Sequence, residues 1–273
     1  MMRVPLLNLQ NRSKLKEEKD FYVGWQKGMS KSNSSFLKKF LIPFFICIPL
    51  VVFAFVYFQK PFNNFKFDFG NITTITGTYY DSPTPMIIAD KGSLADSLSH
   101  DIVLVGYGKF GARGIINTIE KTNGTLNGKR VELAGTLIYG DGKTCMELTE
   151  KEASLKKVLA SPSSNPPVNL AKKDISLSGE ILDPKCYFGA MKPAEGKIHK
   201  SCAIRCISGG IPPIFRTKSN NSNQYYILLG KAGQAINKEV LPYVAEHISI
   251  TGKTNKFSNW DVLYVNVDDI KIK

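Results

Sequence analysis

The sequence contains none of the short motifs that mark the commonest hydrolytic and nucleotide-binding sites. No Gly-x-Ser-x-Gly, His-Glu-x-x-His or P-loop pattern occurs in its 273 residues. A chain without them lacks the usual nucleophile elbow, zinc-protease helix and phosphate cradle. These absences count against ordinary hydrolysis, and we expect a non-catalytic protein rather than an enzyme.

Histidine and cysteine are scarce, with 3 and 5 residues respectively, yet they gather in one stretch. Residues 183–215 hold three of the cysteines and one of the histidines. Within this stretch, 198–207 contains no glycine or proline and is followed by a glycine pair at 209–210. That pattern is typical of a short helix with a glycine C-terminal stop.

Three side chains of ligand type share one face of this predicted helix, because His199, Cys202 and Cys206 stand at i, i+3 and i+7. Cys186 lies thirteen residues before His199, across a loop with two glycines and Pro193 that lets it fold back. Three thiols and an imidazole suit a tetrahedral soft-metal site, with zinc as the default and copper or an iron–sulfur centre as alternatives. The predicted Cys3His ligand set is therefore Cys186, His199, Cys202 and Cys206.

The same residues allow two other interpretations. Cys202 and Cys206 stand at i and i+4 and are poorly aimed at each other, so a disulfide would join Cys186 to one of them and leave a spare thiol. Alternatively, Cys202 or Cys206 is a reactive thiol near a helix end, activated by neighbouring basic side chains. The spacing does not choose between metal ligands, a staple and a redox thiol.

A long apolar run is predicted to cross a membrane. Phe40–Phe58 carries no charge over nineteen residues, which is enough to span roughly 30 Å of hydrocarbon as a helix. Residues 1–39 hold nine basic side chains and three acidic ones, so the positive-inside rule places this tail in the cytoplasm. The run ends in bulky residues rather than at a cleavage site, and it should remain as an uncleaved anchor.

This topology divides the formal net charge of +13. Six of these charges, nine minus three, belong to the tail, where they attract anionic lipid headgroups. The remaining +7, thirteen minus six, is spread over the exported part as on a solvated surface. We therefore expect no nucleic acid partner, but rather the inner membrane and other membrane or periplasmic proteins.

The exported part is predicted to contain two copies of one small β unit. Three pairs of segments match in order: 72–86 with 174–188, 101–111 with 225–235, and 128–148 with 245–265. Their alternating apolar residues and glycine-marked bends predict about five short strands per unit. With a short helix before the last hairpin, the unit resembles an OB-like barrel. The predicted fold class is mostly β, with a single N-terminal transmembrane helix followed by two tandem small OB-like β-barrel units.

The predicted organisation has six segments: a cytoplasmic basic tail (1–39), a transmembrane anchor (40–58), a stalk (59–70), a first OB-like unit (71–159), a Pro/Ser linker (160–173) and a second OB-like unit with the Cys/His loop (174–273). In the first copy the turn at Asp81 leads to the next predicted strand at Asp101, whereas the second copy carries the Cys/His loop at this point. The loop is therefore predicted to be the functional insertion. Cys145 aligns with Val262 and is expected to be buried as a small apolar residue.

The second copy also carries a set of motifs: a Cys-Tyr pair, Gly-Lys-x-His, Cys-Ala-x-x-Cys and Gly-x-Pro before a strand. Their residues within Gly179–Lys273 are Cys186, Lys197, His199, Cys202, Cys206, Gly210 and Pro212. Together they resemble a family of uncharacterised bacterial exported proteins with a small β domain, except that three residues rather than two separate Cys202 from Cys206. The resemblance implies a bacterial envelope location and a fixed role for the loop.

These observations predict a membrane-anchored extracytoplasmic accessory or assembly protein of the bacterial inner membrane, with the N-terminus in the cytoplasm. Its Cys3His loop would bind a metal ion or a redox cofactor. The alternatives are a thiol-redox protein or electron carrier, and a disulfide-stapled OB module that binds a ligand or a partner.

Overall fold

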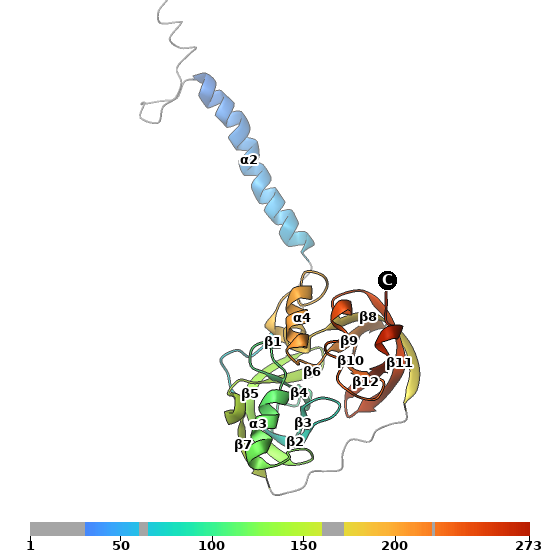
Figure 1. Ribbon diagram of the computed structural model, residues 1–273. Coiled ribbons are helices and arrows are strands. Elements are labelled where there is room, and N and C mark those ends of the chain that lie inside the picture. The colour runs from blue at the N-terminus through green and yellow to red at the C-terminus, as the bar shows by residue number, and fades with distance from the viewer. Residues whose placement is uncertain (1–30, 60–64, 160–171, 220–221) are drawn as a thin grey trace, which may run out of the picture. The chain divides into compact units, whose positions relative to one another are not determined.

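The computed structural model describes residues 31–59, 65–159, 172–219 and 222–273. The chain divides into two compact units, one running to Pro61 and the other covering Phe62–Lys273 (Figure 1). Most of the predicted cytoplasmic tail and linker, and part of the predicted stalk, lie outside the described residues.

The first unit contributes one helix to the described part of the chain, α2 (Lys31–Phe58). It contains the whole predicted membrane-spanning run, with Pro43 and Pro49 inside it, and none of its residues is buried. Its 28 residues extend over about 42 Å at about 1.5 Å per residue. α2 is therefore long and apolar enough to cross a membrane.

The second unit begins with a closed five-stranded barrel. Its strands are β2 (Thr73–Tyr80), β3 (Met86–Ala89), β4 (Asp101–Gly106), β5 (Arg130–Gly140) and β6 (Lys143–Leu148). The pairs β2–β3, β3–β4, β2–β5 and β5–β6 are antiparallel, and the parallel pair β4–β6 closes the ring. The helix α3 (Arg113–Asn123) connects β4 to β5.

The second barrel pairs its strands in the same order. It contains β8 (Lys173–Leu182), β9 (Ile214–Ser219), β10 (Ser222–Gly230), β11 (Ile248–Phe257) and β12 (Trp260–Val265). The parallel pair β10–β12 closes it, and a 3-10 turn, η3 (Leu241–Tyr243), stands before β11 where α3 stands before β5. The predicted fold class, mostly β with one apolar helix and two OB-like barrels, is therefore confirmed.

Short elements extend the barrels at their edges. β1 (Lys66–Phe67) and β7 (Leu155–Leu159) pair with β5, and β13 (Lys271–Ile272) pairs with β11. The 3-10 turns η1 (Lys151–Ser154) and η4 (Val267–Asp269) precede β7 and β13. β1 follows α2 in the chain, so the fold of the second unit begins with a short strand that pairs with β5 of the first barrel.

The structure changes the predicted position of the insertion. β3 lies within 82–100, a stretch for which the sequence predicts no strand. The Cys/His loop therefore connects the first and second strands of its barrel, β8 and β9, and its counterpart in the first barrel is only the turn 81–85. A long insertion thus replaces a tight turn at one point of an otherwise similar barrel.

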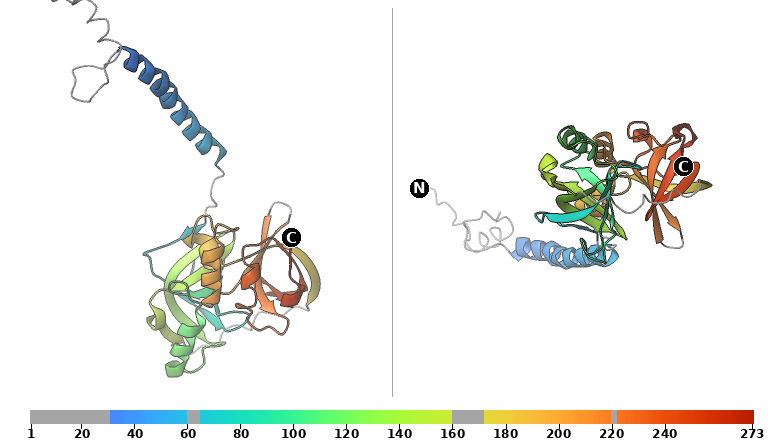
Figure 2. Two further views of the ribbon diagram at one scale, coloured as in Figure 1. Left: turned by 45° about the horizontal axis from the view of Figure 1, so that its top comes forward. Right: turned by 90° about the horizontal axis from the view of Figure 1, so that it is seen from below.

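Three hydrophobic clusters hold the second unit together. One fills the first barrel and one fills the second. The third lies between them and draws residues from both barrels, including Val103, Cys145, Phe188 and Trp260. Burial of Cys145 is therefore confirmed, in the cluster between the barrels. Figure 2 shows the two barrels side by side.

The strand β4 contributes side chains to two hydrophobic clusters, one on each of its faces. In β4, Ile102 and Leu104 point into the first barrel, whereas Val103 and Val105 belong to the cluster between the barrels. Side chains on a strand point alternately to its two faces, so a strand buried on both sides needs a continuous apolar run. That requirement accounts for the sequence Ile-Val-Leu-Val at this position.

Polar contacts cross the same interface. The indole Nε1 of Trp260 donates to the backbone oxygen of Asp101 at 3.0 Å, and the carboxylate of Asp101 accepts hydrogen bonds from Ser258 Oγ and Asn259 N. Lys143 donates to the Asn259 carbonyl at 2.7 Å and its Nζ lies 4.6 Å from the centre of the Trp260 ring. The turn before β12 is therefore fixed to the first barrel.

Candidate metal centre

The Cys/His loop begins with a helix cap. Asp183 directly follows β8, and its Oδ1 accepts a hydrogen bond from Cys186 N at 2.8 Å. Pro184 follows directly, so the pair combines a favoured N-cap residue with a proline at the first helical position. The next turn, Cys186–Ala190, is followed by a π-type hydrogen bond from Met191 N to Cys186 O at 3.1 Å, and Gly189 within it departs from helical backbone angles. The cap fixes the backbone that presents Cys186.

The second part of the loop is the predicted helix. α4 runs over Lys200–Ser208 and ends at Gly209, close to the expected 198–207. Ala203 and Ile207 pack into the core of the second barrel. Cys202 and Cys206 lie one turn apart on the face that meets Cys186. The helix therefore presents two thiols together, as the spacing predicted.

The three thiols form a compact triangle. Cys186 Sγ lies 3.9 Å from Cys202 Sγ and 4.0 Å from Cys206 Sγ, and all three sulfurs lie within 4.8 Å of one another. A disulfide would need about 2.05 Å, and the three cysteines are free. A tetrahedral ion with metal–sulfur bonds of about 2.3 Å would hold its sulfurs about 3.8 Å apart. The triangle therefore has the dimensions of a thiolate metal site.

His199 lies in a second, overlapping group. Its Nε2 is 3.2 Å from Oδ2 of Asp183, and both side chains are buried. The ligand atoms of Asp183, Cys186 and His199 lie within 4.8 Å of one another, but this group does not include Cys202 or Cys206. Among the described residues, the predicted ligands thus form two groups that share Cys186. A metal-ligand role for His199 stays a prediction.

The first barrel contributes Lys109 to the site. Its Nζ lies 2.8 Å from Cys202 Sγ and 3.9 Å from Cys206 Sγ. Lys109 belongs to the loop between β4 and α3, 93 residues before Cys202 in the chain. Nothing in the local sequence marks this lysine, because only the packing of the two barrels brings it to the thiols.

The close packing of these groups shifts the pKa values of Cys186 and Cys206 in opposite directions. The hydrogen bond that Cys186 donates lowers the pKa of Cys206, and the positive charge of Lys109 acts in the same direction. The same hydrogen bond and burial raise the pKa of Cys186. The hydrogen bond to Cys202 raises the pKa of Lys109. The site therefore favours negative charge on Cys206 beside a positively charged lysine.

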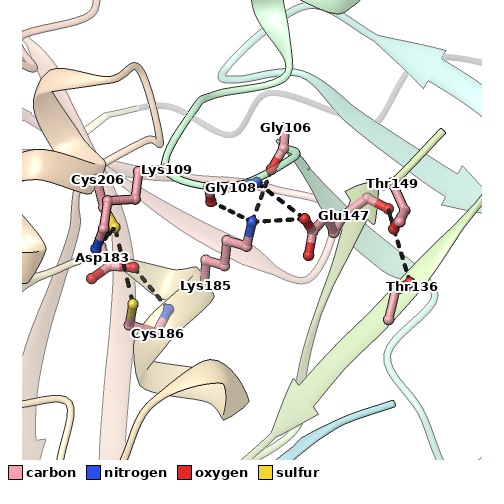
Figure 3. Close-up of polar contacts among 10 residues, drawn as sticks. All are labelled: Gly106, Gly108, Lys109, Thr136, Glu147, Thr149, Asp183, Lys185, Cys186 and Cys206. Carbon is pink, nitrogen blue, oxygen red and sulfur yellow. Dashed lines mark hydrogen bonds and ion pairs between the residues drawn. The ribbon is translucent and has the colours of Figure 1, made fainter. Parts of the chain in front are cut away.

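A buried ion pair holds the Lys109 loop in place (Figure 3). Lys185 Nζ donates to the carbonyls of Gly106 and Gly108 at 2.9 and 2.6 Å, and it lies 3.1 Å from Glu147 Oε1. Glu147 Oε1 also accepts a hydrogen bond from Gly108 N at 3.2 Å. Because Lys185 immediately precedes Cys186, this network fixes the first barrel's loop relative to the site's first thiol.

The end of α4 touches the same loop through backbone atoms. Gly111 N donates to Gly209 O at 3.0 Å. A Cβ added at Gly111 would lie 2.0 Å from Gly210 O, and one added at Gly209 would lie 2.0 Å from Lys109 O. Only glycine allows the two segments to approach this closely. In Figure 2, α4, in orange, accordingly lies against the first barrel although it belongs to the second.

We expect Gly111→Ala to lower the free energy of unfolding by about 1–3 kcal/mol, the usual cost of forcing extra atoms into a packed contact. Gly114→Ala is the matched control, because a Cβ there meets nothing within 4 Å. It lies in α3, where alanine is favoured over glycine. Chemical denaturation of both variants measures the difference, and equal stabilities would show that the loop does not depend on this contact.

Comparison of the chain with protein-family models, curated proteins and solved structures gives no match. Function is therefore inferred from the geometry of the site.

Proposed function

We propose that this protein is a membrane-anchored accessory or assembly protein that holds a soft metal ion on the three thiolates of Cys186, Cys202 and Cys206. The observation that carries the proposal is the sulfur triangle. Two of its members are almost fully buried, with Cys186 5% and Cys206 1% exposed. Soft thiolate sets bind zinc, copper(I) or iron–sulfur centres, and zinc is the default choice for a mononuclear site.

Asp183 and His199 have a supporting role in this proposal. Asp183 holds the amide of Cys186 through one carboxylate oxygen and the imidazole of His199 through the other. Such outer hydrogen bonds orient ligands in metal sites. The rival ligand set is the Asp183, Cys186 and His199 group, which offers one sulfur instead of three.

The proposed location is the bacterial inner membrane, with α2 as an uncleaved anchor and the barrels outside the cytoplasm. The support is the apolar helix together with the excess of basic residues before it, nine against three in residues 1–39. The resemblance to bacterial exported proteins points the same way. Membrane or periplasmic proteins that exchange metal would be its partners.

Metal analysis tests the proposal. The full-length protein, purified in detergent under reducing and anaerobic conditions and incubated with Zn²⁺, should hold about one ion per chain after gel filtration. Cys186→Ser and Cys206→Ser each remove a buried ligand, and each should lose the ion. Cys47→Ser is the matched control, because Cys47 lies in α2.

His199→Ala separates the two ligand sets. In the three-thiolate set this variant keeps the metal with reduced affinity, by about 10- to 100-fold for a lost outer-shell partner. A complete loss of metal from His199→Ala, with retention by Cys202→Ser, would assign the ion to the Asp183, Cys186 and His199 group. In a second preparation without reducing agent, a metal-free wild type in which mass spectrometry finds Cys186 joined to Cys202 or Cys206 would contradict the proposal and support a disulfide staple.

A further inference from the structure

We propose that the three-thiolate site keeps its fourth coordination position open and that this position takes a thiolate from a second molecule, attracted by Lys109. This inference rests on the proposed function, and it adds the class of ligand that the bound metal would accept. It also explains why a residue of the first barrel reaches a site built by the second.

The described residues offer three ligands and no fourth. No histidine, cysteine, aspartate or glutamate ligand atom among them lies within 4.8 Å of all three sulfurs. His199, the fourth ligand predicted from the sequence, is paired with Asp183 instead. Closed zinc sites use four protein ligands, whereas sites that exchange a ligand use three and leave one position free. The set therefore matches an exchange site.

The side of the triangle formed by Cys202 is the one that reaches solvent. Cys186 and Cys206 are buried, whereas Cys202 is partly exposed. Lys109, which is exposed, approaches this side and places its ammonium group 2.8 Å from Cys202 Sγ. An incoming fourth ligand thus meets the ammonium group, which favours an anion over a neutral molecule.

Two exposed aromatic residues stand beside Lys109 in the same loop. Tyr107 is 56% exposed and Phe110 is 64% exposed. Soft metal ions prefer sulfur ligands, so the favoured anion is a thiolate. It can come from a small thiol or from a cysteine of a partner protein, and an apolar surface at the entrance would favour a partner's cysteine.

On binding, one metal–sulfur bond forms, a water molecule leaves the metal, the thiol proton passes to the buffer, and no electrons are transferred.

Cobalt(II) substitution tests this inference, because the visible spectrum of Co²⁺ reports its ligands. The full-length protein in detergent is loaded with Co²⁺ and titrated anaerobically with 2-mercaptoethanol or with imidazole, a neutral ligand. We expect both to change the spectrum while gel filtration shows that Co²⁺ stays bound. Lys109→Gln should weaken 2-mercaptoethanol binding about tenfold, as for loss of a charge-assisted contact, and leave imidazole binding within about twofold. Lys109→Arg should restore most of the thiol affinity.

The peptide acetyl-Leu-Cys-Leu-amide distinguishes the two sources of thiolate. Tighter binding of the peptide than of 2-mercaptoethanol, reduced by Phe110→Ser, would assign the position to a partner protein, and equal binding would assign it to small thiols. A Co²⁺ spectrum that neither thiol nor imidazole changes would overturn the inference, because it would mean a closed four-ligand site. An equal loss of thiol and imidazole affinity in Lys109→Gln would overturn the role of Lys109. Failure of the proposed function is distinct from both, because the protein would then bind no Co²⁺, or Cys202→Ser would keep its Co²⁺ as expected for the Asp183, Cys186 and His199 group.

Discussion

Lys185→Met should lower the free energy of unfolding by about 3–5 kcal/mol, the effect of removing one partner from a buried ion pair. Lys185 and Glu147 are each 5% exposed, and the ammonium lies 3.1 Å from the carboxylate. Methionine fills a similar volume but leaves the Glu147 charge and the carbonyls of Gly106 and Gly108 without their shared donor. The loop that carries Lys109 would lose the two hydrogen bonds that Lys185 donates to it.

Denaturation of the full-length protein in detergent, followed by near-ultraviolet circular dichroism, measures this effect. Lys197→Met is the matched control, because the Lys197 side chain is 82% exposed and lies 3.8 Å from Glu246. An exposed pair of this kind contributes about 0–1 kcal/mol. If both variants had the same stability as the wild type, the buried ion pair would not be needed to hold the two barrels together.

Trp260→Ala should also cost about 3–5 kcal/mol, the usual range for a buried tryptophan. Trp260 is fully buried in the cluster between the barrels, where its ring lies 6.5 Å from that of Phe188. It also donates to the backbone of Asp101 in the first barrel. Because this cluster joins the barrels, we expect both to unfold in one transition in the wild type.

Hydrogen exchange measured by mass spectrometry follows the two barrels separately in this experiment. In Trp260→Ala, peptides from β4 and from β10 should lose protection together, since both strands contribute to the shared cluster. Ile198→Ala is the control, because Ile198 is 81% exposed and its removal should change stability by less than about 0.5 kcal/mol. Loss of protection in the second barrel alone would show that the barrels fold independently.

Much of the fold could be predicted from the sequence because its signals are local. Alternating apolar residues and glycine-marked bends indicated the strands, and the uncharged run indicated α2. The strand β3 was missed because it has only four residues, Met86–Ala89, and directly follows a proline-rich turn. The apolar run in β4 indicates that both faces of the strand are buried. No local pattern, however, indicates that the face pointing away from the first barrel packs against the second barrel.

The site could be predicted only where its residues share one element. Cys202 and Cys206 were found because helical spacing places them on one face, and Cys186 was found because the loop before the helix is short. The sequence around Asp183 predicts only a turn. The pairing of Asp183 with His199 depends on the tertiary position of α4. Lys109 and Lys185 act across the two barrels, and long-range contacts of this kind leave no periodic pattern in the chain.

The most direct test of the central claim is X-ray absorption spectroscopy of the zinc-loaded full-length protein. The three-thiolate site predicts three sulfur atoms at about 2.3 Å from the ion, with one lighter atom at about 2.0–2.2 Å in the fourth position. Cys206→Ser should lose the ion or show at most two sulfurs. A first coordination shell of the ion with a single sulfur among nitrogen and oxygen atoms would contradict the account, because the ion would then be bound by Asp183, Cys186 and His199.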